Sequence, residues 1–147
     1  MIVRINDFLA EDHYRLDHLL ESFHNCKPRN PTRAKELLAL FESALHRHLQ
    51  WEETTLFPLF EHKTSQAVLT RALLREHQEI RERLEALSAK LEQNDADSDS
   101  EEKVLVGVLN GHNAREEYAL YPELDKLLSD AEKNRVFEAL TTLSGGA

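Results

Sequence analysis

The sequence predicts an all-α protein, an antiparallel up-down-up-down four-helix bundle with a short C-terminal fifth helix. The chain of 147 residues has only 4 glycines and 4 prolines, too few for a sheet protein built on many tight turns. Apolar residues recur at helical spacing along most of the chain. Short connections between four long helical segments are typical of such a bundle.

Helix-capping residues set the expected boundaries of the first two helices. Asp7 is expected to cap a helix that ends near residue 25, where the sequence CKPRNP interrupts the pattern. Asn30 followed by Pro31 suits an N-cap and a first-turn proline. The second helix is therefore predicted to run from 31 to about 61, which closes a first hairpin over residues 7–61.

The second half of the chain repeats this organisation. Thr64 or Ser65 is expected to start a third helix that ends near residue 93, and the acidic stretch 94–102 is expected to be a solvated loop. A fourth helix completes a second hairpin over residues 65–128. Ser129 and Glu132 resemble a capping box for a short helix over residues 130–143. All of these elements are assigned to one domain, residues 1–147.

Composition narrows the classes of partner. The net charge of −9 argues against nucleic acid, whose phosphates require concentrated Lys and Arg. The single cysteine, Cys26, excludes an internal disulfide. We find no signal peptide and no segment that could span a membrane, so the expected location is cytoplasmic. The oligomeric state is left open.

A repeat with an offset of 64 residues carries half of the 8 histidines. The first and third helices share an acidic residue followed by histidine, at His13 and His77. The second and fourth helices share H-x-x-x-E-E-x-x-L-[FY]-P, which begins at His48 and His112. The chain is thus predicted to consist of two related helical hairpins around a pseudo-twofold axis.

The spacing within the repeat indicates a metal site. A histidine and a glutamate four residues apart lie on the same side of a helix, one turn apart. A charged glutamate on an apolar stripe is costly unless it is compensated, and a bound cation would compensate it. Mixed nitrogen and oxygen ligands with open positions suit iron or manganese more than structural zinc. The expected ligands are His13, His48, Glu52, His77, His112 and Glu116.

Other interpretations of these residues stay open. Single core histidines usually serve only as hydrogen-bonding residues, and shared ancestry of the hairpins could preserve the pattern in a helical interaction module without metal. Asp17, Glu53, Glu117 and Tyr121 are candidates for the layer around the ligands. For Asp17 the alternative is a surface ion pair, for Glu53 and Glu117 a solvated position, and for Tyr121 core packing.

Several further residues are assigned less specific roles. Gly107 and Gly111 precede His112 on the fourth helix, where they would permit either close helix packing or space for a small ligand beside the metals. The remaining histidines do not recur at the offset of 64 residues and are expected at or near the surface. They are His18, His24, His46 and His62.

The acid-histidine starts and the two H-x-x-x-E-E-x-x-L-[FY]-P blocks resemble the hemerythrin HHE cation-binding family of non-haem di-iron proteins. The resemblance covers roughly residues 7 to 128. It implies an antiparallel four-helix bundle in which the four repeated histidines are terminal ligands and Glu52 and Glu116 bridge two iron ions. Leu73 stands where oxygen-carrying hemerythrins have a further histidine, and Glu116 is four residues after His112 rather than an aspartate five residues after it.

The four-histidine, two-glutamate set is more similar to repair-of-iron-centres proteins and related bacterial HHE proteins. That resemblance implies an oxygen-bridged di-iron centre, with manganese or zinc as substitutes. It also implies that oxygen, nitric oxide or peroxide binds at an open metal position, in sensing or stress response. A di-iron enzyme that removes peroxide or nitric oxide and an iron-storage or iron-donating protein are the alternatives.

Overall fold

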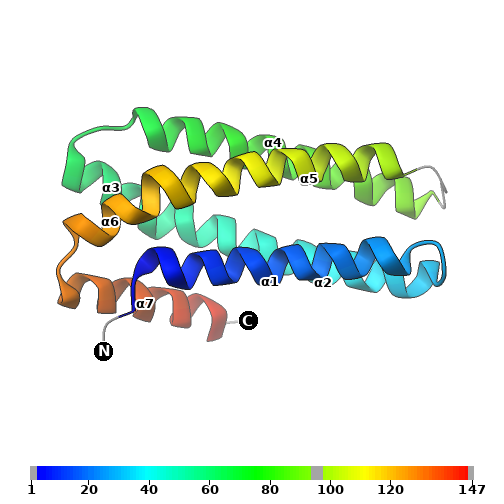
Figure 1. Cartoon of the computed structure of the whole chain (residues 1–147), viewed down its shortest axis with the longest axis horizontal. Helices are drawn as coiled ribbons and strands as arrows, with labels where there is room; N and C mark the ends of the chain where they lie inside the picture. Colours follow the sequence, from blue (N-terminus) through cyan, green and yellow to red (C-terminus); the bar gives the residue numbers. More distant parts are fainter. Residues whose placement is uncertain (1–2, 94–97, 146–147) are drawn as a thin grey trace.

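The computed structural model describes residues 3–93 and 98–145, with side chains as far as residue 140, and within these ranges every regular element is helical. The predicted all-α class is confirmed. Figure 1 shows long helical arms lying side by side along the molecule. The turn after α1, the last turn of α4 and the first turn of α5 lie at one end, and the turns after α3 and α6 lie at the other.

The first hairpin consists of α1 (Ile5–Cys26) and α2 (Pro31–Trp51), which continues through a π-helical turn, η1 (Glu52–Leu56), into α3 (Phe57–Thr64). The start of α2 is as predicted. The Asn30 side chain accepts a hydrogen bond from the Arg33 N–H at 3.1 Å, and Pro31 occupies the first turn, where its missing N–H costs nothing.

The second hairpin has the same construction. It consists of α4 (Val68–Glu92), α5 (Asp99–Arg115), a second π-helical turn, η2 (Glu116–Leu120), and α6 (Tyr121–Leu127). The last helix is α7 (Asp130–Gly145). Its predicted capping box is present, because the Ser129 N–H donates to Glu132 at 2.9 Å and the Glu132 N–H donates to the Ser129 hydroxyl at 3.2 Å.

Two predicted helix starts are wrong. Asp7 does not cap α1. The N–H groups of Ile5 and Asn6 donate instead to the Asp125 carboxylate of α6, at 2.7 and 3.0 Å, so the cap comes from a distant part of the chain. Ser65 does not start α4 either. It ends α3 in a left-handed conformation with φ 56°, and α4 begins only at Val68.

The predicted acidic loop is shorter than expected. Residues 94–97 lie outside the described ranges, while Asp99 begins α5 and Glu102 is only 8% exposed. The Lys27 ammonium reaches both acids, at 2.5 Å from Asp99 and 3.0 Å from Glu102. The ammonium at the end of α1 therefore offsets part of the negative charge at the start of α5.

Apolar side chains form two clusters, one toward each end of the bundle. One contains Leu16, Leu20, Phe23, Phe41, Leu45, Ile80, Leu84 and Leu105 among its members. The other contains Ile5, Leu9, Trp51, Leu56, Phe57, Leu73, Leu120 and Tyr121 among its members. Of the described helices, not one combines the length and apolar character needed to cross a membrane. The expected cytoplasmic location stays a prediction.

Candidate metal centre

The six side chains expected to bind metal come together between the two apolar clusters. Each of the four long helices contributes one histidine, and each π-helical turn begins with one glutamate. All six are buried, with at most 5% of the residue exposed. They are His13 on α1, His48 on α2, Glu52 on η1, His77 on α4, His112 on α5 and Glu116 on η2.

One half of the site offers four donor atoms that all lie within 4.8 Å of one another, from Glu52, His77, His112 and Glu116. His77 Nε2 is 3.2 Å from Glu52 Oε1, and His112 Nε2 is 3.2 Å from Glu116 Oε2. These distances suit ion pairs, but none of the four atoms has a hydrogen-bond partner among the described residues. Four buried, converging, unpartnered nitrogen and oxygen atoms are unusual in proteins, and they are the donors that a metal cation would use.

The other half is formed by His13 and His48 with the second oxygen of Glu116. Donor atoms of these three residues also lie within 4.8 Å of one another. His13 Nε2 lies 3.2 Å from His48 Nε2 and 3.2 Å from Glu116 Oε1. Glu116 therefore contributes one oxygen to each half of the site, as a bridging carboxylate would.

A second layer of carboxylates holds the outer nitrogen of His13 and His48. His48 Nδ1 is 2.6 Å from Asp12 Oδ2, and His13 Nδ1 is 3.1 Å from Glu117 Oε2. A carboxylate can only accept, so each Nδ1 carries a proton and each Nε2 faces the interior of the site. Such partners fix the orientation of a metal-binding imidazole and raise its basicity.

The second hairpin repeats this layer at the offset of 64 residues. His112 Nδ1 is 2.8 Å from Glu76 Oε1, and His77 Nδ1 is 2.7 Å from Glu53 Oε2. Glu53 thus bonds to His77, just as Glu117 bonds to His13. Both contacts agree with the orienting role considered for these two glutamates. The matching role of Glu76 and its counterpart Asp12 was missed, although the acid before each repeated histidine was a visible signal.

The carboxylates also decide the charge of the imidazoles. Burial lowers the pKa of His77, but contacts with Glu116 and Glu52 raise it to about 9. Burial likewise lowers the pKa of His48, whereas the charge of Glu52 and the bond to Asp12 raise it well above its ordinary value. Burial raises the pKa of Glu116, but the surrounding imidazoles hold it well below its usual range. The same negative charge would attract a cation that displaces these protons.

The two π-helical turns bring a side chain to the site that a regular α-helix would direct elsewhere. Five residues along an α-helix correspond to a rotation of about 140° beyond a full turn, which would point Tyr121 away from Glu116. In η2 the Tyr121 N–H bonds to the Glu116 carbonyl, so the wider turn returns Tyr121 to the same side. Pro122 and its counterpart Pro58 follow the two π-helical turns, where the wider backbone reduces the clash with the preceding turn.

Tyr121 is fully buried and its hydroxyl contacts three members of the site. It donates to Glu52 Oε2, at 2.5 Å, and it lies 2.9 Å from Glu116 Oε1 and 3.3 Å from His13 Nε2. Burial, together with the charges of Glu116 and Glu52, raises the pKa of Tyr121 well above its ordinary value. The phenol therefore stays protonated and serves as a hydrogen-bond donor between the two carboxylates.

A model of the hemerythrin HHE cation-binding domain matches residues 4–124. The chain belongs to this family. The match spans all six clustered histidines and glutamates, so a cation-binding domain with a His/Glu metal site is the assignment that sequence and geometry share. Comparisons with curated proteins and with solved structures found no match.

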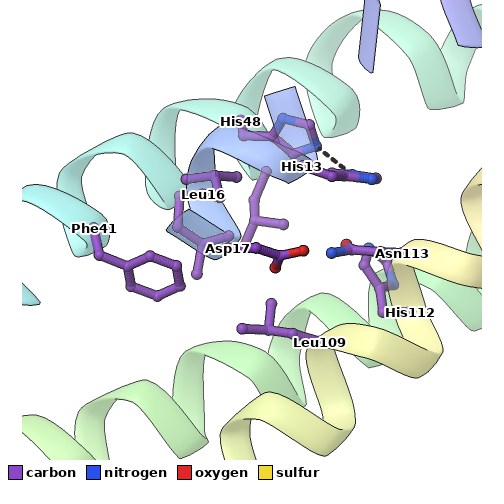
Figure 2. Close-up of a pocket in the computed structure, with 10 residues that line it drawn as sticks. His13, Leu16, Asp17, Phe41, His48, Leu109, His112 and Asn113 are labelled. Atoms are coloured by element: carbon purple, nitrogen blue, oxygen red, sulfur yellow. Dashed lines mark hydrogen bonds between the residues drawn. The ribbon is translucent and has the colours of Figure 1, made fainter. Parts of the chain in front are cut away.

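A small, largely enclosed cavity of this HHE domain lies against three of the imidazoles. Its volume is about 10 Å³, which is enough for about one water-sized molecule. Figure 2 shows Phe41 and Leu16 toward one end and His112 and Asn113 toward the other. The cavity is lined by His13, Leu16, Asp17, Phe41, Leu45, His48, Leu49, Leu109, His112 and Asn113.

Three expectations about residues near the HHE site can now be judged. Asp17 is exposed at the edge of the cavity. The imidazole Nδ1 atoms bond to other carboxylates, so Asp17 is not their acceptor. Gly107 and Gly111 are exposed, and a Cβ added at either would meet nothing within 4 Å. They neither permit close packing nor line the cavity, so both roles considered for them are wrong. The four unrepeated histidines are exposed, as expected.

Proposed function

We propose that the six clustered side chains bind two iron ions and that an open metal position binds a small ligand, namely oxygen, nitric oxide or peroxide. On this proposal each metal is held by two imidazoles, both carboxylates are shared, and the helices run in antiparallel up-down-up-down order. The protein would act in sensing or in a stress response. The proposed metal ligands are His13, His48, Glu52, His77, His112 and Glu116.

The observation that carries this proposal is the set of unpartnered atoms in the core. Glu52 Oε1, His77 Nε2, His112 Nε2 and Glu116 Oε2 are buried without a hydrogen bond to any described residue. They face one another at ion-pair distances of 3.2 Å. Buried charge of this kind is costly unless it is compensated, and a bound metal cation would compensate it. Imidazole nitrogen and carboxylate oxygen together suit iron, with manganese or zinc as substitutes.

The cavity supports a small ligand. It holds about one water-sized molecule, and its walls are mostly apolar apart from the imidazoles, Asp17 and Asn113. A cavity of this size fits a diatomic molecule or peroxide and is too small for a nucleotide or a sugar. Bound iron would supply open coordination positions and electrons, while the protein supplies a narrow, largely enclosed approach.

Metal analysis tests the site directly. We expect protein produced with iron to contain close to two transition-metal ions per chain, and we expect Glu52→Ala and Glu116→Ala to lose at least one of them. Glu42→Ala is the matched control, because the Glu42 side chain is 39% exposed and its carboxylate lies 3.9 Å from the exposed His46. Folded wild-type protein without bound metal would refute the proposal.

Reaction with small molecules separates the candidate roles. The iron-loaded protein is exposed to air, nitric oxide or peroxide while its visible spectrum is recorded. A stable and reversible spectral change supports ligand binding or sensing. Rapid loss of many equivalents of peroxide or nitric oxide supports an enzyme. Iron that leaves the folded protein on reduction, without either response, supports storage or donation of iron.

A further inference from the structure

One position breaks the pseudo-twofold symmetry of the metal site. Phe57 and Tyr121 occupy equivalent places in the repeat, each after a π-helical turn. The Phe57 ring packs beside His77 with 5.2 Å between centroids, and the Tyr121 ring packs beside His13 at 5.7 Å. The two halves thus have matching aromatic neighbours, but only one of these neighbours carries a hydroxyl.

That hydroxyl occupies the half formed by His13 and His48. It donates to Glu52 Oε2 and lies within bonding distance of Glu116 Oε1, the oxygen that faces His13. His13 Nε2 and His48 Nε2 are also bonded to each other, at 3.2 Å. A cation entering this half must break the bond between the imidazoles and at least one bond of the Tyr121 phenol.

The half formed by His77 and His112 has no such internal bonds. The Nε2 atoms of both imidazoles, with Glu52 Oε1 and Glu116 Oε2, lack hydrogen-bond partners among the described residues. These four atoms converge within 4.8 Å. Phe57 beside them has no group that could bond to either carboxylate. A cation that enters displaces the ion pairs of His77 with Glu52 and of His112 with Glu116, both at 3.2 Å, just as it displaces the pair of His13 with Glu116 in the other half. It displaces no bond from a phenol.

We propose that Tyr121 makes the two halves of the site unequal, so that a divalent cation fills the His77–His112 half first and the His13–His48 half second. This inference rests on the proposed metal binding and specifies its order. Tyr121 is a positioning residue on this account, because it acts by holding Glu52 and Glu116 through hydrogen bonds. The second position is then the one that exchanges its metal more readily.

The size of the difference follows from the bonds that must break. A hydrogen bond to a charged group is worth at least a factor of about ten in an equilibrium constant. We therefore expect the second binding constant of the wild-type protein to be at least about tenfold weaker than the first. Tyr121→Phe removes the phenol bonds, and we expect it to strengthen the second step by about tenfold while the first step changes little.

Cobalt(II) titration of the metal-free full chain tests this order, with the visible absorption of cobalt reporting each binding step. His13→Ala and His77→Ala are a matched pair, because the two histidines are equivalent in the repeat. We expect His13→Ala to retain the tight step and His77→Ala to retain only the weak one. Circular dichroism checks that each variant is folded.

The outcomes separate this inference from the proposed function. Wild-type protein that binds no cobalt refutes the metal site itself. Two cobalt ions bound with equal constants, or unequal constants that Tyr121→Phe leaves unchanged, overturn the role of Tyr121 and leave the metal site standing. If Tyr121→Phe does not fold, the two histidine variants decide the question. Equal losses of cobalt affinity in His13→Ala and His77→Ala overturn the proposed order.

Discussion

Asp12→Asn tests whether the outer carboxylates support the metal site. Asp12 accepts a 2.6 Å hydrogen bond from His48 Nδ1. Asparagine keeps the size and an acceptor oxygen but removes the negative charge, so the imidazole stays in place while its basicity falls. We expect the variant to fold and to bind metal more weakly.

The magnitude follows from the bond and its exposure. A hydrogen bond to a charged group contributes about 1.5–3 kcal/mol, and the Asp12 side chain is 31% exposed, which reduces its contribution through solvent screening. The lower end of that range corresponds to about tenfold in affinity. Outer partners of metal ligands typically change affinity by about 10–100-fold, so about tenfold is the expected loss.

The assay is competition for cobalt(II) between the protein and a chelator at neutral pH. Asp7→Asn is the matched control, because Asp7 is an exposed aspartate on the same helix and is not part of the lining of the cavity beside the imidazoles. Arg15→Gln is a second control, since Arg15 also pairs with Asp12, at 3.1 Å. Equal affinity of Asp12→Asn and the wild-type protein would refute the role assigned to the outer carboxylates.

Two further predictions concern the fold. Leu105→Ala should lower the free energy of unfolding by about 2–5 kcal/mol, because Leu105 is fully buried. The neighbouring Val104 is 41% exposed, so Val104→Ala should change the free energy of unfolding by less than about 0.5 kcal/mol. If urea denaturation shows equal losses of stability for the two variants, the assigned core is contradicted. The Lys63 ammonium and the Ser129 N–H lower the pKa of Glu132 from 4.5 to about 2, so Glu132 stabilises the fold above about pH 4.5 and loses this effect as the pH falls toward 2. Thermal unfolding should therefore show Glu132→Gln to be less stable than wild type at pH 6 and the difference to shrink at pH 3, whereas a constant difference would exclude a charge effect.

The histidine and glutamate cluster was accessible from the sequence because its signals are local. A histidine and a glutamate four residues apart must share a side of their helix, and the offset of 64 residues repeats that arrangement. The caps at Asn30 and Ser129 were also predictable, since each bonds within three residues of itself. The assignment of these residues as metal ligands stays a prediction until metal is measured.

The same local signals could not predict the contacts between helices. Asp125 caps α1 from 120 residues away, so the apparent cap at Asp7 was wrong although its residue type was suitable. Ser65 likewise has a residue type that can start a helix, but it ends α3. The assignment of Asp12 to His48 and of Glu76 to His112 depends on the rotation of one helix against another, which no local spacing specifies.

The sequence by itself determined the helical class, the two related hairpins and the residue types available in the core. These follow from periodicity, which acts over a few residues. Only the tertiary structure decided which carboxylate orients which imidazole and how Tyr121 reaches Glu52. The physical reason is that a π-helical turn and the packing of helices set rotations and axial shifts, so side chains far apart in the chain meet only when the bundle assembles.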